Sequence, residues 1–322
     1  MGYQDQTKKR KTGAEVAQAL SAHIKGKTVL TTGVSPKSLG ASFVQTIAAH
    51  SPKLLILAGR DASKIDQTVS EIKSINPHVS TRSLILDLSS QAQIREAAAE
   101  VNGYEENIDV LVNNAGVMAC PYSSTVDGLE TQFGTNHIGH FLFTNLILDK
   151  VLASPNPRIV NVSSDGHWIS PIRWDDIGFE NGNTYNQWRA YGQAKTANIL
   201  FSVHLAEKLG DKGLHSFSLH PGAIWTNVGR HITSDEEIKQ LFEITPHLKK
   251  GGDSFLLISI EEGTSTHVYA AFDPEIEGVN GAYLMDAGIA PEKEIKPYAV
   301  DKTEAAKLWK LSEDIVGQKF EI

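Results

Sequence analysis

The chain has 322 residues, of which 41% are hydrophobic and 21% charged, a composition that suits a globular protein with a sizeable core. Its 30 basic and 38 acidic residues give a net charge of -8, which argues against nucleic-acid binding and favours a small-molecule ligand. The single cysteine, Cys120, excludes an internal disulfide and a thiolate metal cage, so we expect a cytoplasmic protein without a metal. No apolar run approaches the ~20 residues of a membrane span.

Seven short runs of β-branched residues or leucine recur along the chain, with the nearly continuous apolar character of strands buried on both faces. They span residues 28–32, 54–58, 83–87, 110–113, 159–162, 216–219 and 282–285. Segments with helical spacing lie between the runs, at residues 41–50, 62–75, 91–101, 129–152 and 196–209. This alternation predicts an α/β fold of the Rossmann type, doubly wound, in which a seven-stranded parallel sheet is flanked by helices.

The elements group into one central domain over residues 26–290, with an appendage at each end. Residues 1–25 form an arm with a short helix, and residues 291–322 form a helical tail. Two long excursions follow strands of the central domain, at roughly residues 166–188 and 226–253. Because ligands of open α/β sheets bind beyond the carboxyl ends of the strands, we expect these excursions to form the substrate walls.

The turn after the first predicted strand reads Thr32-Gly-Val-Ser-Pro-Lys-Ser-Leu-Gly40 and leads into a helix. A strand, a glycine-bearing turn and a helix N-terminus make an anion site, because free backbone amides and the helix dipole face the ligand. A plain strand-to-helix connection is the alternative. If the site binds a pyrophosphate, the residues placed to hold it are Thr32, Gly33, Ser35, Lys37, Leu39 and Gly40.

The second predicted strand is followed by Arg60 and Asp61, where nucleotide-binding folds meet the adenosine ribose. Arg60 would pair with a 2′-phosphate, whereas Asp61 would accept a hydrogen bond from a free 2′-hydroxyl. Lys37, in the preceding turn, adds a second cation. The two cations favour NADP(H) as the cofactor, while Asp61 leaves NAD as the alternative.

The ends of the third and fourth predicted strands carry further candidate cofactor contacts. Asp87 and Leu88 are placed to hold the edge of an adenine. The fourth strand ends in Asn113-Asn-Ala-Gly116, where small residues allow close approach of a ligand and asparagine amides can bond both strands and cofactor. We therefore expect Asn114, Ala115 and Gly116 to contact the cofactor.

Tyr191 and Lys195 are spaced so that, within one helix, the lysine lies one turn beyond the tyrosine on the same face. A free phenol titrates near pH ~10, and a neighbouring cation would lower its pKa toward the range needed for proton transfer. The spacing by itself is also that of a surface tyrosine beside a solvated lysine. The order of the other motifs decides between these interpretations.

In that order the chain resembles the short-chain dehydrogenase/reductases, in the branch of the retinol dehydrogenases and related fungal oxidoreductases. The match runs from roughly residue 26 to residue 287. It comprises Thr32-Gly33 with Gly40, Asp87, Asn113-Asn-Ala-Gly116, Thr135-Asn-His137, Val162-Ser-Ser164, Tyr191-x-x-x-Lys195 and Pro221-Gly222 with Thr226.

The resemblance implies a role for each matched residue. Ser164, favoured over Ser163 by the family register, would bind the substrate oxygen, and Tyr191 would transfer its proton. Lys195 would hold the nicotinamide ribose and lower the pKa of Tyr191, while Asn136 would bend its helix and anchor a water joining Lys195 to solvent. The segment that would close over the nicotinamide carboxamide contributes Pro221, Gly222, Ile224 and Thr226. Members of the family often form homodimers through helices that flank the active site.

The phosphate turn departs from the family pattern Thr-Gly-x-x-x-Gly-x-Gly. Lys37-Ser38 replaces the middle glycine, and Gly40 comes one residue late. Because residues with a Cβ resist positive φ, we expect the turn to follow a different backbone path.

Two other groups of residues suggest different chemistry. Ser164, Asp165 and His167 resemble the members of a hydrolase triad, but they lack the Gly-x-Ser-x-Gly context. His137 and His140 have the spacing of metal ligands without a third ligand, so packing or a structural hydrogen bond is favoured.

The sequence thus predicts an NADP(H)-dependent oxidoreductase that reduces a ketone or aldehyde, or oxidises the corresponding alcohol, with Tyr191 as acid and base. Aromatic residues in and beside the two excursions favour an apolar substrate, which can contain rings. They are Trp168, Trp174, Phe179, Trp188 and Trp225. The alternatives are a non-redox enzyme on the same scaffold, such as a cyclase or dehydratase, and an NADP-binding sensor.

Overall fold

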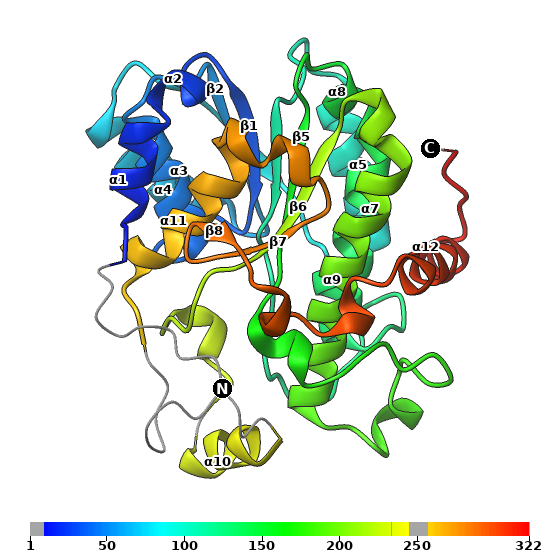
Figure 1. Ribbon diagram of the computed structural model, residues 1–322. Coiled ribbons are helices and arrows are strands. Elements are labelled where there is room, and N and C mark those ends of the chain that lie inside the picture. The colour runs from blue at the N-terminus through cyan, green and yellow to red at the C-terminus, as the bar shows by residue number, and fades with distance from the viewer. Residues whose placement is uncertain (1–9, 233, 245–256, 322) are drawn as a thin grey trace.

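A single sheet forms the centre of the computed structural model, which describes residues 10–232, 234–244 and 257–321 (Figure 1). The strand order is β3-β2-β1-β4-β5-β6-β7-β8. The strands are β1 (Thr28–Thr32), β2 (Leu54–Gly59), β3 (Ser80–Ile85), β4 (Val110–Asn113), β5 (Arg158–Val162), β6 (His215–His220), β7 (Tyr283–Met285) and β8 (Gly288–Ile289). Strands β1 to β7 run parallel, which confirms the prediction, and the short β8 adds an antiparallel edge.

Helices cover both faces of the sheet (Figure 1). One face carries α1 (Gly13–Ala19), α2 (Ser21–Ile24), α3 (Leu39–Ala48), α4 (Ala62–Ile75) and α11 (Ile260–Phe272). The other carries α5 (Gln91–Asn102), α6 (Thr131–Phe133), α7 (Gly139–Leu146), α8 (Leu148–Leu152), α9 (Gln187–Leu209) and α12 (Lys302–Val316). The remaining helix, α10 (Asp235–Ile244), lies beyond the carboxyl ends of the strands.

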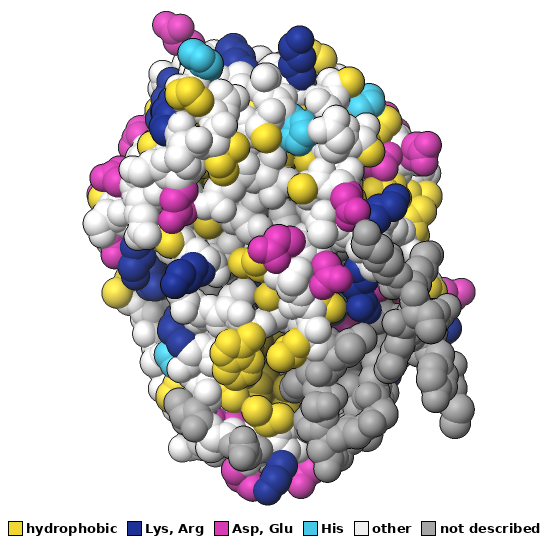
Figure 2. All heavy atoms as spheres, turned by 90° about the vertical axis from the view of Figure 1, so that its left-hand side faces the viewer, with side chains coloured by type: hydrophobic (Ala, Val, Ile, Leu, Met, Phe, Trp, Pro, Cys, Tyr) yellow, Lys and Arg dark blue, Asp and Glu magenta, His cyan; other side chains and the backbone are white. Residues whose placement is uncertain are grey.

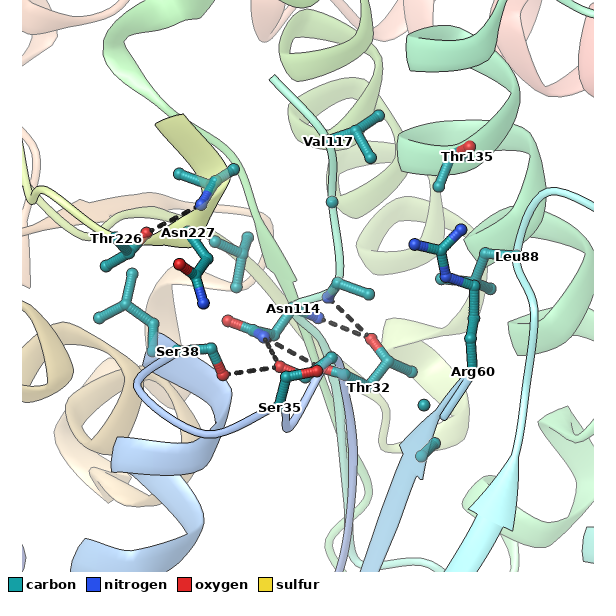
Figure 3. Close-up of a pocket in the computed structure, with 18 of the residues that line it drawn as sticks. Thr32, Ser35, Ser38, Arg60, Leu88, Asn114, Val117, Thr135, Thr226 and Asn227 are labelled. Carbon is teal, nitrogen blue, oxygen red and sulfur yellow. Dashed lines mark hydrogen bonds between the residues drawn. The ribbon is translucent and has the colours of Figure 1, made fainter. Parts of the chain in front are cut away.

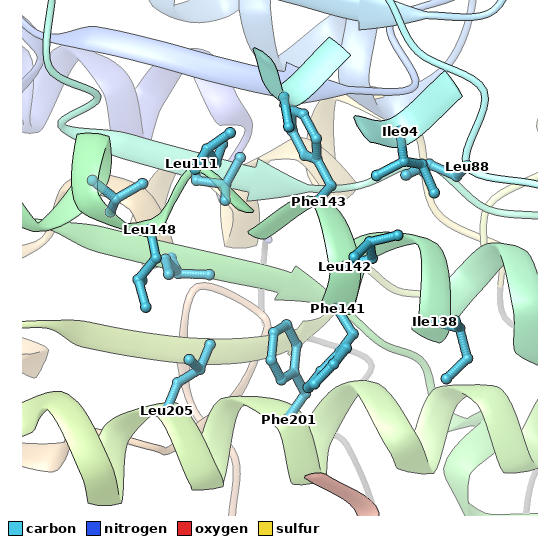
Figure 4. Packing of buried hydrophobic residues seen from close by; sticks show 14 of the residues in the cluster. Leu88, Ile94, Leu111, Ile138, Phe141, Leu142, Phe143, Leu148, Phe201 and Leu205 are labelled. Atoms are coloured by element: carbon cyan, nitrogen blue, oxygen red, sulfur yellow. The ribbon is translucent and has the colours of Figure 1, made fainter. Parts of the chain in front are cut away.

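The sheet separates two hydrophobic cores because successive side chains of a strand point to opposite faces. Val29 of β1 belongs to the core under α3 and α11, whereas its neighbour Leu30 belongs to the core under α7 and α9. In the second core, shown in Figure 4, Phe141 of α7 packs beside Phe201 of α9 with ring centroids 5.6 Å apart. This burial on both faces explains why the strands read as nearly continuous apolar runs.

Helix α11 is absent from the sequence prediction, although it packs against the sheet. Its buried residues include the consecutive Thr264, Ser265, Thr266 and His267, which interrupt any apolar period. The polar atoms are tolerated because they bond the helix backbone: the Thr264 hydroxyl donates to the Ile260 carbonyl at 2.8 Å. The capping box formed by Ser259 and Glu262 is the sequence signal that marks this helix.

Two predicted helices have different limits in the structure. Helix α9 begins at Gln187, well before residue 196, because the Asn186 side chain accepts hydrogen bonds from the first free amides. The single helix expected over residues 129–152 is divided into α6, a π-helical turn over Gly134–Ile138, α7 and α8. The first change places Tyr191 inside a helix, and the second places Asn136 at a local widening of one.

The described parts of both appendages, residues 10–25 and 291–321, pack onto the central domain, and residues 1–9 of the arm lie outside the described residues. A Cβ at Gly13 of α1 would lie 2.8 Å from the Thr264 Cγ2, so α1 and α11 are in close contact. Leu308 and Trp309 of α12 join the core under α9. In the part of the chain that the structure describes, no helix has both the length and the apolar character needed to cross a membrane.

Candidate active site

A cleft at the carboxyl ends of the strands brings together most of the predicted site residues (Figure 3). The predicted residues that line it are Thr32, Gly33, Ser35, Leu39, Arg60, Asp87, Leu88, Asn114, Ala115, Gly116, Tyr191, Lys195, Pro221 and Thr226. The predicted residues outside its lining are Lys37, Gly40, Asn136, Ser164, Gly222 and Ile224. The cleft thus joins the turn after β1 to the tyrosine and lysine of α9.

Gly33 is required by the close approach of β1 and β4. Its φ is +75°, and a Cβ there would lie 2.6 Å from the Ala115 Cα. Ser38 caps α3 by accepting from the Ala41 amide at 3.1 Å, while its hydroxyl donates to the Gly33 carbonyl at 3.0 Å. The turn therefore presents the remaining free amides of α3 to the cleft, which suits a pyrophosphate.

Lys37 and Gly40 support this turn from outside the cleft lining. The expectation of a different backbone path is met in part, because Lys37 itself adopts positive φ, at 62°, despite its Cβ. A Cβ at Gly40 would lie 2.5 Å from the Asn114 Nδ2 and 2.6 Å from the Gly33 carbonyl oxygen. Gly40 thus permits close packing of the turn and does not itself line the cleft.

Thr32 and Asn114 fasten the ends of β1 and β4 to each other. The Thr32 Oγ1 accepts from the amides of Asn114 and Ala115 at 3.0 Å each. The Asn114 Nδ2 donates to the Thr32 carbonyl at 2.9 Å, and its Oδ1 faces the Nε2 of His267 at 3.2 Å. His267 lies on α11, which the sequence prediction missed, and its contact orients an asparagine that lines the cleft.

Arg60 and Asp61 both line the cleft after β2, but they differ in their partners. Asp61 caps α4: its Oδ1 accepts from the Ser63 and Lys64 amides, and its Oδ2 lies 3.6 Å from the Lys64 Nζ. The hydrogen bond from the Ser63 hydroxyl, followed by that from Lys64, lowers the pKa of Asp61. Arg60 extends along the cleft wall toward Leu88 (Figure 3), and no described residue forms an ion pair or hydrogen bond with it.

Tyr191 and Lys195 are both buried on α9, one turn apart. The Lys195 Nζ lies 5.6 Å from the centre of the Tyr191 ring and donates to the Val162 carbonyl at 3.0 Å. Burial lowers the pKa of Lys195 to about 8. This excludes a surface tyrosine beside a solvated lysine.

Lys195 was expected to lower the pKa of Tyr191, but burial of the phenol has the larger effect on that pKa. Burial raises the pKa of Tyr191 to about 12, and it outweighs the hydrogen bond from Ser164, which lowers that pKa. The carboxylate of Asp165 raises it further. Tyr191 is therefore a neutral phenol at pH 7, ready to donate a proton.

The structure distinguishes Ser164 from Ser163. The Ser163 hydroxyl is buried and donates to the Lys195 carbonyl at 2.7 Å, which fixes the catalytic turn of α9. The Ser164 Oγ accepts from the Gly166 amide at 3.0 Å and is hydrogen-bonded to the Tyr191 hydroxyl. Position 166 requires glycine, because a Cβ there would lie only 2.7 Å from the Tyr191 Cε1. Ser164 is thus the serine beside the proton donor.

Asn136 lies in the π-helical turn, as the expected bend requires. Its side chain makes two bonds to Val117: the Oδ1 accepts from the Val117 amide at 2.8 Å, and the Nδ2 donates to the Val117 carbonyl at 2.9 Å. It therefore holds the loop that follows β4 against the cleft. A water between Asn136 and Lys195 stays a prediction.

The histidines of the proposed metal pair have structural partners. The His137 Nε2 lies 2.8 Å from the Ser312 Oγ of α12. His140 bridges the Asn136 carbonyl, 3.0 Å from its Nδ1, and the Thr32 Oγ1, 2.9 Å from its Nε2. Burial lowers the pKa of His140 to about 4, so the ring is neutral. This confirms the interpretation as packing and structural hydrogen bonds.

The hydrolase triad is also excluded by the contacts of its members. The Asp165 Oδ2 lies 3.2 Å from the Nε2 of His220, not beside His167. The His167 Nδ1 faces the Ser164 backbone carbonyl at 2.8 Å and not its hydroxyl. Among the described residues, neither His167 nor His220 is placed as a base for the Ser164 hydroxyl.

The segment after β6 only partly matches its predicted role. Pro221 and Thr226 line the cleft, but the Ile224 side chain packs against Gly263 of α11. Gly222, with φ +96°, gives room to the Ile258 side chain. Gly222 and Ile224 therefore pack on the side of the segment that faces away from the cleft. The cleft residues that the sequence did not single out as cofactor contacts include Ser38, Val117, Asn227, Val228 and Arg230.

The described parts of the two excursions lie at this end of the molecule (Figure 1). Of their aromatic residues, Phe179 and Trp188 are buried and cannot face a ligand in the cleft, whereas Trp225 is 65% exposed. Trp168 and Trp174 bond the C-terminal region, through the Glu294 carbonyl and the Glu304 carboxylate. The last part of the second excursion, residues 245–253, lies outside the described residues.

Curated proteins of known family are similar in sequence to this chain over most of its length. The family model for short chain dehydrogenases matches residues 27–174. Retinol dehydrogenase 14 of Homo sapiens is 37% identical over 305 residues, which cover 91% of this chain and 87% of the relative. The short-chain dehydrogenase/reductase prx1 of Penicillium rubens is 38% identical over 301 residues, which cover 90% of this chain and 84% of the relative.

Solved structures agree with the fold. An uncharacterized protein from Mycobacterium paratuberculosis superimposes with a TM-score of 0.68 at 29% identity, covering 94% of this chain and 98% of that chain. NADPH-bound carbonyl reductase from chicken fatty liver, at 20% identity, shares the fold with a TM-score of 0.58, covering 83% and 99%. Given the relatives above 30% identity and the geometry of Ser164, Tyr191 and Lys195, the chain belongs to the short-chain dehydrogenase/reductase family and is an oxidoreductase of alcohols or carbonyl compounds.

Proposed function

We propose that the protein is a cytoplasmic, NADP(H)-dependent reductase of an apolar ketone or aldehyde, which also oxidises the corresponding alcohol. The observation that carries the proposal is the buried Tyr191 phenol, hydrogen-bonded to Ser164 and one turn from Lys195. When bound, the nicotinamide supplies hydride chemistry. Ser164 and Tyr191 would orient the carbonyl oxygen and Tyr191 would protonate it, while Lys195 would bind the nicotinamide ribose.

The cleft lining includes the apolar side chains of Val117, Pro221 and Val228, which support the choice of substrate class, and a buried apolar cluster lies next to Val117. Ala119, Trp188 and Leu241 pack together, with Met118 at their edge, and so join the loop after β4 to α9 and α10. Val117, next to this cluster, lines the cleft. Figure 2 shows hydrophobic side chains gathered in a hollow beside the residues that the structure does not describe. Such walls favour an apolar substrate, including one that contains rings.

The proposed activity is tested by mixing the protein with NADPH and a panel of aldehydes and ketones of increasing apolar size. We expect oxidation of NADPH and formation of alcohol in equal amounts, with kcat/KM rising as the apolar part grows. Product formed without net NADPH oxidation would instead identify a cyclase or dehydratase. Tight NADPH binding with no turnover of any compound would favour a sensor.

The preference for NADP(H) rests on Arg60, which has no charged partner among the described residues, while Asp61 caps α4. We expect Arg60→Ala to raise the KM for NADPH by about 10- to 100-fold, because a charge-assisted hydrogen bond to a phosphate is lost. The KM for NADH should change little. Asp61→Ala is the comparison variant at the neighbouring lining residue: if the cofactor is NADP(H), loss of the helix cap should leave both KM values nearly unchanged. A selective loss of NADH binding in Asp61→Ala would indicate an NAD enzyme.

The packing of α12 bears on the homodimer expected from the resemblance. Trp309 of α12 covers α7 and α9, with its ring 4.9 Å from that of Phe141 and 4.7 Å from that of His204. A dimer formed through these two helices would have to displace α12. We therefore expect light scattering after size-exclusion chromatography to give the monomer mass of 35.1 kDa. A mass twice as large would show that another surface pairs or that α12 moves.

A further inference from the structure

His167 lies three residues after Ser164, in a 3-10 turn over Asp165–Trp168, and its side chain is fully buried. Its Nδ1 lies 2.8 Å from the Ser164 carbonyl oxygen, which also accepts from the His167 backbone amide at 3.1 Å. Because a carbonyl oxygen can only accept, the Nδ1 must carry the proton. The imidazole therefore donates to the backbone of the serine that binds Tyr191.

The other ring nitrogen of His167 faces a distant part of the chain, residues 292–299, which we call the C-terminal segment. The backbone amide of Lys296 donates to the Nε2 at 3.3 Å, so the Nε2 is unprotonated and the ring is neutral. Burial, despite the opposing effects of the Ser164 bond and Asp165, lowers the pKa of His167 to about 4. His220 and Lys296 also face the ring and lower that pKa. Both nitrogens are thus used, and the ring has one orientation.

The C-terminal segment holds the same 3-10 turn at two further points. The Tyr298 hydroxyl donates to the His167 carbonyl at 2.7 Å, and the Trp168 Nε1 donates to the Glu294 carbonyl at 3.1 Å. The Lys296 Nζ also lies 4.1 Å from the centre of the Trp168 ring. Three hydrogen bonds therefore join the 3-10 turn after Ser164 to the C-terminal segment, which lies about 130 positions away in sequence.

We propose that His167 is a positioning residue for Ser164, and that the C-terminal segment acts on the reaction through it. Ser164 lies two residues beyond the end of β5 and caps the 3-10 turn over Asp165–Trp168, so the position of its hydroxyl depends on the position of its backbone. His167 fixes that backbone by binding its carbonyl, and the Lys296 amide fixes His167. The inference rests on the proposed function, in which Ser164 orients the substrate oxygen. A displacement of about 1 Å at such a group can lower a rate by about 100-fold.

A matched pair of variants tests the bond to Ser164. Asparagine places an amide donor near the position of the Nδ1, whereas glutamine places its amide near the Nε2 and leaves the Ser164 carbonyl without the side-chain donor. With NADPH and retinal or benzaldehyde as the probe, we expect His167→Gln to lower kcat by about 10- to 100-fold. His167→Asn should recover most of it, and the KM for NADPH should be unchanged in both. Equal losses of kcat and of melting temperature in the two variants would show a purely structural role.

A double-mutant cycle tests whether His167 acts through Ser164. Ser164→Ala is expected to lower kcat by about 100-fold and to leave a measurable rate. In that background His167→Gln should cost less than about threefold, because no hydroxyl remains to be positioned. If His167→Gln costs the same factor with and without Ser164, the proposal is wrong.

The contribution of the C-terminal segment is tested at the Lys296 backbone. Lys296 has φ -74°, which proline can adopt, and Ile295 is extended, as a residue before proline must be. Lys296→Pro removes the amide that binds His167 and should lower kcat by about three- to tenfold. Lys296→Ala keeps the amide and removes only the ammonium beside Trp168, so kcat should stay within about twofold. Equal kcat values in the two variants would overturn the role of the segment.

These experiments distinguish a failure of the positioning role of His167 from a failure of the proposed function. If Ser164→Ala and Tyr191→Phe both retain full turnover, the proposed function fails. If those two variants are impaired while His167→Gln turns over at the wild-type rate, only the positioning role fails. Should wild-type protein reduce neither probe, a crystal structure of His167→Gln decides: the proposal requires the Ser164 hydroxyl to leave Tyr191.

Discussion

Replacing Tyr191 by phenylalanine is expected to lower kcat by about 100- to 10,000-fold, the usual contribution of a positioned general acid. The phenol is buried, and its pKa of about 12 keeps it protonated at neutral pH. No other described side chain is seen to bind the Ser164 hydroxyl, so no second acid stands in its place. The rate of NADPH oxidation with an aldehyde substrate measures the loss.

The interpretation requires that Tyr191→Phe still binds the cofactor. Phenylalanine keeps the ring that packs against Gly166, so the NADPH dissociation constant, measured by protein fluorescence, should change by less than about threefold. Tyr269→Phe on α11 is a suitable control, because Tyr269 is a half-buried tyrosine away from the cleft lining. Undiminished kcat in Tyr191→Phe would contradict the assignment of the acid.

The placement of Tyr191 beside Lys195 could be predicted because it is local. Tyr191 and Lys195 are one helical turn apart, and any helix through both places them together. The end of β4 was predictable for a similar reason, since the carboxyl ends of parallel strands meet at one edge of the sheet. What spacing could not show was the sign of the pKa change of Tyr191. That sign depends on burial by many residues at once, and burial prevails.

Other features could not be predicted because they depend on partners far apart in sequence. Ile224 follows a strand beside the cleft, yet its side chain packs against Gly263, on the helix that the apolar pattern failed to reveal. His267 on that helix orients Asn114 through a contact across 153 positions. The capping bonds of Asp61 to α4 were likewise not evident from its place after the second strand. In each case the direction of a side chain, and not its place in the chain, decides its role.

Replacing Lys195 by methionine is expected to lower kcat by more than about 100-fold and, at the same time, to make the protein more stable at neutral pH. Activity falls because the cation that would bind the nicotinamide ribose is removed. Stability rises because the folded protein no longer buries an ammonium group, and methionine fills a similar volume. The Val162 carbonyl, which loses one donor, still accepts from the Asn198 Nδ2 at 3.0 Å.

The gain in stability should depend on pH in a defined way. The pKa of Lys195 falls from 10.5 to about 8 on folding, so below pH 8 both states are protonated and the full cost of burial, about 3 kcal/mol, is present. Between about pH 8 and 10.5 the folded lysine loses its proton before the unfolded one does, and wild-type stability rises relative to the variant. We therefore expect urea unfolding to show Lys195→Met more stable by about 1 to 3 kcal/mol at pH 7, with the difference shrinking as the pH approaches 10. Lys302→Met, at a 72% exposed side chain, should show no such trend. A difference that stays constant over this range would mean that Lys195 is not buried as a charge.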